Sequence, residues 1–147
     1  MRKGSHSLTQ PQMRLIMSVS KKHKEVNEGM TNLLSHMKED YHKWSMMGRT
    51  VHSNTEDFIR ETEIREDMEA EYGKGLHYEE HTKYIKVMSS SRGGGLCVKC
   101  FVVNTENDKK FRFGDILKPA GWKGPARNFA RGNILENDFR GVRWTGC

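Results

Sequence analysis

The spacing of apolar residues changes at Gly75, and this change constrains the fold of the 147-residue chain more than any other feature. Before Gly75, apolar residues recur every three or four positions, which is typical of amphipathic helices. After Gly75 they alternate with polar residues in short runs separated by glycine-rich segments, which indicates strands and turns. The sequence therefore predicts an α+β chain in which the helices come first.

The domain organisation follows from the same change. We expect a polar lead over 1–11, a helical hairpin arm over 12–75 with helices at about 12–47 and 55–72, and a β module over 76–147. The β module is predicted to be a small five-stranded antiparallel sheet or an SH3-like or OB-like barrel. Its strands are expected over 83–88, 96–103, 111–118, 132–135 and 141–145.

The first predicted helix carries an apolar seam whose members are spaced alternately three and four residues apart. The seam consists of Ile16, Val19, Val26, Met30, Leu33, Met37 and Trp44, with His23 and Asp40 interrupting it. This spacing fits a coiled coil through which the chain associates with a second copy. It fits equally well an amphipathic helix that packs on the chain's own domain.

Charge is also divided unevenly along the chain. Residues 1–75 carry equal numbers of acidic and basic side chains, so the formal net charge of +6 falls on residues 76–147. A basic module is suited to an acidic partner. We expect no membrane partner, because no apolar run is long enough to span a bilayer, and no secretory signal is recognisable. Three cysteines without framework spacing indicate free thiols in a reducing cytoplasm.

Three short motifs suggest chemistry that their context does not favour. His77-Tyr-Glu-Glu-His81 has the spacing of an inverted zinc-protease motif, which requires a helix, and here a solvated connector is expected. Cys97 and Cys100 form a C-x-x-C, but side chains alternate along a strand, so residues three apart point to opposite faces. Cys100 is expected to share the buried face with Leu96, Val98 and Val102, and Cys97 to lie on the other face. The segment 91–95 lacks phosphate-loop spacing and is expected to be a slack turn. We predict no catalytic residue, no metal and no cofactor.

The candidate binding site is the loop 118–131, which is long for a compact domain and contains no acidic residue. The candidate binding residues are Lys118, Trp122, Lys123, Arg127, Asn128, Phe129 and Arg131, together with Arg143. Cations can follow a phosphate backbone and aromatic rings can stack on bases. Two alternatives stay open. The two rings plug the end of a barrel, or the loop binds an acidic protein or a small anion.

Three segments resemble a C-terminal module of small uncharacterised proteins of tailed bacteriophages. They are Lys-Tyr-Ile-Lys-Val at 83–87, the stretch 111–134 that begins Phe-Arg-Phe-Gly-Asp, and Val-Arg-Trp-Thr-Gly at 142–146. The resemblance covers about residues 75–147. It implies a viral origin and action in the host bacterial cytoplasm, and it brings no established activity.

Together these features predict a non-enzymatic binding or regulatory protein whose basic β module engages an acidic target, with nucleic acid favoured. The alternative is a phage accessory factor that binds a host protein of transcription, translation or defence and inhibits or redirects it. Self-association through the helical arm is compatible with both.

Overall fold

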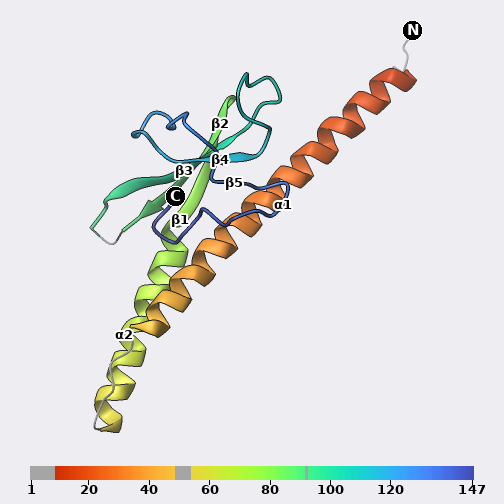
Figure 1. Cartoon of the computed structure of the whole chain (residues 1–147). Coiled ribbons are helices and arrows are strands. Elements are labelled where there is room, and N and C mark those ends of the chain that lie inside the picture. The colour runs from red at the N-terminus through yellow and green to blue at the C-terminus, as the bar shows by residue number, and fades with distance from the viewer. Residues whose placement is uncertain (1–8, 49–53, 92) are drawn as a thin grey trace.

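A computed structural model describes residues 9–48, 54–91 and 93–147, and the side chains of residues 15–21 are outside the description. Two helices precede a five-stranded antiparallel sheet, which confirms the α+β arrangement. Figure 1 shows a long helix, α1, that crosses the whole molecule, with α2 beside its C-terminal part and the sheet against its middle. Neither described helix has an apolar stretch of the length that crossing a bilayer requires.

Helix α1 (Gln10–Met47) begins at a capping box. The Thr9 hydroxyl accepts a hydrogen bond from the Gln12 amide at 3.2 Å, and the Gln12 side chain accepts one from the Thr9 amide at 2.9 Å. Pro11 lies in the first turn, where its missing N–H is not needed. The helix therefore includes the last residues of the predicted polar lead, of which residues 1–8 lie outside the description.

Helix α2 (Thr55–Gly75) begins after Asn54, whose side chain accepts a hydrogen bond from the Asp57 amide at 2.8 Å. The helix continues past the predicted end at 72 and runs directly into the first strand. A side chain at Gly75 would collide with the carbonyl oxygen of Ser90, so a glycine is needed where the helix passes the strand.

The sheet is an open meander in which each strand pairs with the next one in the chain. Its strands are β1 (Leu76–Glu80), β2 (Tyr84–Ser90), β3 (Leu96–Val103), β4 (Asp115–Leu117) and β5 (Gly132–Asn133). Two predictions are wrong. The expected connector around His77 is the edge strand β1, and the expected strand 141–145 forms only an isolated bridge between Arg143 and Gly146. The backbone of segment 141–145 is instead hydrogen-bonded by side chains of the two helices, namely His36, Asp40 and Tyr72.

A β-bulge at Lys99 changes which side chains of β3 are buried together. The register of β2 against β3 shifts there, and Lys99 is left without a partner. Cys100 and Val102 face α1, whereas Val98 packs in the cluster on the opposite face and Leu96 is 46% exposed. The predicted single apolar face is therefore wrong, because strict alternation fails at the extra residue.

The main hydrophobic core lies between one face of the sheet and the middle of α1. The helix contributes Val26, Met30, Leu33 and Met37, and the sheet contributes Ile85, Val87, Cys100, Val102 and Ile116. Over this stretch the apolar seam packs on the chain's own domain, which is one of the two alternatives that its spacing allows. The middle of α1 is consequently part of the core of the β module.

Gly29 lies where α1 meets the segment that follows β5. A Cβ atom at Gly29 would be 3.0 Å from both the Cβ and the carbonyl oxygen of Ile134. A glycine inside a helix costs about 1 kcal/mol relative to alanine. The close approach of the two segments explains why a glycine occupies this position.

The last residues return to the helices and close one end of the core. The Trp144 amide donates to the Asp40 carboxylate at 2.8 Å, and the Trp144 carbonyl accepts from the Tyr72 hydroxyl at 2.7 Å. The rings of Tyr41 and Tyr72 stack at 4.6 Å, and both meet the Trp144 ring edge-on. These contacts tie both helices to the C-terminal segment.

Candidate functional site

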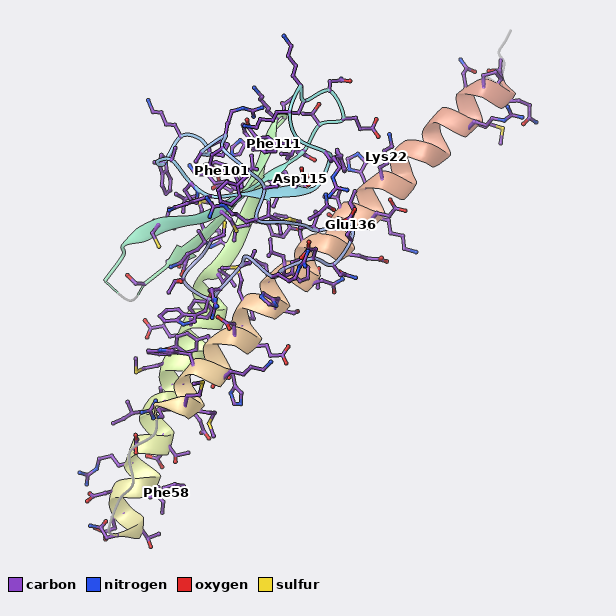
Figure 2. All side chains as sticks on the ribbon, in the orientation of Figure 1. Lys22, Phe58, Phe101, Phe111, Asp115 and Glu136 are labelled. Atoms are coloured by element: carbon purple, nitrogen blue, oxygen red, sulfur yellow. The ribbon has the colours of Figure 1, made fainter. Side chains whose placement is uncertain are left out.

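The loop 118–131 connects β4 to β5 and lies over the sheet face opposite α1. A bridge between Pro119 and Pro125 and a hydrogen bond from the Ala126 amide to the Lys118 carbonyl at 2.7 Å close the loop on itself. Beneath it is a second apolar cluster that includes Phe101 and Phe111, both of which are labelled in Figure 2. The predicted site residues of the loop therefore stand on a packed platform.

Trp122 covers a buried cation. The Lys86 Nζ lies 3.5 Å from the centroid of the Trp122 ring and 5.9 Å from that of Phe101. Lys86 is only 8% exposed, whereas Trp122 is 47% exposed. An ammonium under an aromatic face is stabilised by the ring quadrupole. Trp122 is thus partly a cover for the sheet and partly an exposed surface, so neither predicted role excludes the other.

Arg127 is engaged inside the module. Its guanidinium donates to both carboxylate oxygens of Asp108 at 2.8 and 3.0 Å and to the Tyr84 hydroxyl at 2.6 Å. The Asp108 side chain is 1% exposed. Hydrogen bonds from Arg127 and from the Phe111 and Lys110 amides hold the pKa of Asp108 well below its usual range. Arg127 therefore acts as a cross-link between two loops through its two terminal nitrogens.

Arg131 and Phe129 form a second cation–aromatic pair in the loop. The Arg131 guanidinium carbon lies 3.9 Å from the centroid of the Phe129 ring, and Phe129 is 57% exposed. In the described part of the chain, the Arg131 Nε is a buried side-chain nitrogen without a hydrogen-bond acceptor. The side chain of Asn128 accepts a hydrogen bond from the Phe129 amide at 2.8 Å, so Asn128 shapes the backbone of the loop.

The remaining predicted site residues are separated by the fold. Lys118 and Lys123 are exposed on the loop, and the described residues give neither of them an ion pair. Arg143 is exposed but lies beside Trp144, in the segment that packs on the helices. Lys118, Trp122 and Lys123 therefore share one exposed loop, and Arg143 lies outside it.

Two further lysines belong to this end of the sheet. Lys83 and Lys109 line a cavity of about 470 Å³, together with Thr82, Thr105 and Arg127. Two turns form it, and the Asn104 amide joins them by donating to the Lys83 carbonyl at 2.9 Å. Sequence reasoning misses these lysines because only the pairing of β2 with β3 brings the two turns together.

In the described part of the module, the salt bridges give its own lysines no acidic partner. Salt bridges engage the acidic residues Glu106, Asp108, Asp115, Glu136 and Asp138, and their partners include Arg112, Arg127, Arg140 and Lys22 of α1. Figure 2 labels Lys22, which lies on α1, and Glu136, which lies on the part of the module beside α1. Among the described residues, the lysines and arginines of the module that form these salt bridges are all arginines, so its excess positive charge rests mainly on lysines.

The metal-like motifs have other roles. His77 lies on β1 and its Nδ1 is 2.8 Å from the Gly75 carbonyl oxygen, so the helix that a zinc-protease motif needs is not formed. The bulge overturns the argument that Cys97 and Cys100 face apart. Val98 packs on the face opposite Cys100, and neighbouring residues of a strand alternate, so Cys97 lies on the same side as Cys100. Cys97 is nevertheless exposed and Cys100 buried, and both are free thiols. Among the described residues, no group of three His, Cys, Asp or Glu is arranged to hold a metal ion.

The comparison with protein families identifies the group to which this fold belongs. A family model described as a family of unknown function, DUF7717, matches residues 10–147. The chain belongs to this family. The match includes α1 as well as the sheet, in agreement with their shared core. No curated protein and no solved structure matches the chain significantly. Family membership brings no activity, and the resemblance to phage proteins stays an expectation.

Proposed function

We propose that the chain is a non-enzymatic binding protein whose 76–147 module engages nucleic acid through the phosphate backbone. One observation carries the proposal. Most acidic residues of the module are paired with arginines, while the described residues give Lys83, Lys109, Lys118 and Lys123 no ion-pair partner. Lys118 and Lys123 lie on the loop of the half-exposed Trp122, and Lys83 and Lys109 line the cavity beside Arg127. Neutralisation of phosphates by such cations is the main source of sequence-independent affinity for nucleic acid.

The arginines and the aromatic rings have separate roles in this proposal. Arg127 holds the loop against Asp108 and Tyr84, so it positions the surface without contacting the ligand. Trp122 and Phe129 each rest on a cation and expose the rest of their rings. Exposed rings can stack on unpaired bases, which favours single-stranded ligands over duplexes.

The test is the salt dependence of binding to fluorescently labelled single-stranded and duplex oligonucleotides, measured by anisotropy. Replacing Lys118 and Lys123 by Ala should lower the slope of log K against log salt by about 0.7–0.9 for each lost phosphate contact. The matched control replaces Arg112 and Arg140 by Ala, which removes the same total charge from two residues that pair with Glu136 and Asp138. That control should leave the slope close to the wild-type value.

Trp122→Ala separates stacking from structural support. We expect the variant to lose more affinity for single strands than for duplexes, each loss being measured relative to wild type. The melting temperature of the variant is measured in parallel. Absence of salt-dependent binding to any nucleic acid at low salt would refute the proposal. Salt-tolerant binding of one host protein would then support the alternative, a phage accessory factor. The bacterial cytoplasm is the location that we propose with either function.

A further inference from the structure

The helical hairpin carries an apolar groove that runs from the contact of Tyr41 and Trp44 with Trp144 toward the end that lies farthest from the sheet. The groove encloses about 490 Å³ between α1 and α2, and its apolar lining is formed by Tyr41, Trp44, Ile64 and Met68. Trp44, Ile64 and Met68 are each at least 50% exposed. Figure 2 shows that this part of the hairpin, with Phe58 at its end, projects away from the β module. A two-helix layer with an exposed apolar face lacks the second layer that normally buries it.

The seam of α1 cannot supply that second layer. Its middle residues Val26, Met30, Leu33 and Met37 are buried against the sheet. Self-association through these positions would require the sheet to leave the helix. The exposed apolar face belongs to α2 and to the C-terminal part of α1.

Two charged residues beside the groove, Arg60 and Asp67, are complementary to each other under a two-fold rotation, on a helix that otherwise carries an excess of acidic side chains. Arg60 precedes Ile64 by four residues and Asp67 follows it by three, so all three lie on one side of α2. Arg60 and Asp67 are both exposed, and the described residues give neither an ion-pair partner. Within one helix they are seven residues, or about 10 Å, apart, so they do not pair with each other.

We propose that the groove is occupied by a second copy of the chain, with the two α2 helices antiparallel about a two-fold axis near Ile64. In this arrangement Ile64 meets Ile64 of the other copy, and each Arg60 lies beside Asp67 of the other copy. The interface is isologous and closed, and two hairpins pack as a four-helix bundle. The two β modules lie at opposite ends of the dimer. This inference does not depend on the ligand of the β module.

The test is sedimentation equilibrium of the full chain from micromolar to near-millimolar concentration. Wild type should form dimers. Ile64→Asp should abolish dimerisation, because each dimer would bury two unpaired carboxylates at its centre. The matched control is Leu96→Asp, which changes a residue of similar exposure at the start of β3 and should leave the dimer intact. Circular dichroism of each variant checks that it folds.

Charge reversal identifies the contact itself. Arg60→Glu or Asp67→Arg alone should weaken the dimer by roughly tenfold, since each replaces two attractive pairs with two repulsive ones. Both reversals in one chain should restore the wild-type dissociation constant. Lys24→Glu, an exposed charge change on α1 away from the groove, should have little effect. A monomer at every concentration, a dimer that survives Ile64→Asp, or a double reversal that fails to restore binding would each overturn the proposal.

Discussion

Replacing Gly29 by Ala tests how closely α1 packs on the sheet. The new methyl group would lie 3.0 Å from two atoms of Ile134 and 3.2 Å from a third, which is closer than ordinary van der Waals contact. The helix would gain about 1 kcal/mol in propensity. Overpacking of a buried site typically costs about 1–3 kcal/mol. We therefore expect a net change in unfolding free energy between about zero and 2 kcal/mol of destabilisation.

Gly73→Ala is the matched control, because the same substitution is made in another helix with open space around it. A Cβ atom at Gly73 would meet only the flexible side chain of Lys38, at 3.7 Å. This variant should gain up to about 1 kcal/mol, so the two variants should differ by about 1–3 kcal/mol. Urea unfolding followed by circular dichroism measures both, with equal m values as the check that the same surface is exposed. Equal stabilisation by the two substitutions would refute the close contact between α1 and Ile134.

Two further predictions concern ionisable groups. Because the folded-state pKa of Asp108 lies below its unfolded value of about 3.9, the stability that its pairing with Arg127 provides is present above that value and is lost as pH falls through the folded pKa. Asp108→Asn should lower the free energy of unfolding by about 1.5–3 kcal/mol at neutral pH. Below about pH 4 its stability should fall less steeply than that of wild type, as measured by urea unfolding at a series of pH values. An equally steep fall in both proteins would contradict this. A thiol-reactive dye should label exposed Cys97 first and buried Cys100 only on unfolding. The pKa of Cys100 is raised, first by a hydrogen bond with Cys147 and second by burial, which also slows its reaction. Loss of the fast phase in Cys97→Ala checks the assignment, and three equal rates would contradict it.

Local chemistry was sufficient to predict the elements whose signals are local. The long helix follows from apolar spacing, and the strand around Ile85 and Val87 follows from alternation. The edge strand β1 escaped prediction because only Leu76 and Tyr78 face the core, and the charged residues between them resemble a connector. The bulge at Lys99 has no local signal, because it depends on how β3 registers against β2.

The candidate site was predictable in position more than in detail. The composition of the loop predicts cations and rings close together, and Arg131 and Phe129 form such a pair, whereas Trp122 covers Lys86 of β2, which lies outside the loop. The sequence does not reveal that Arg127 is committed to Asp108, because the partner lies nineteen residues away in another loop. It also gives α1 two equally good partners, because a heptad seam has the same spacing whether a sheet or a second helix covers it.

The contacts of α1 have a consequence for how the chain is made. Its partners Asn137, Val142 and Trp144 follow Asn32, His36 and Asp40 by 105, 106 and 104 residues. Translation proceeds at about 5–20 residues per second, so these three side chains of α1 wait roughly 5–20 s for the segment that they bind. The strands β2 and β3 are synthesised earlier and can cover the apolar seam first, so the C-terminal segment is the last part of the core to be added. Such distant pairings also slow folding once synthesis is complete.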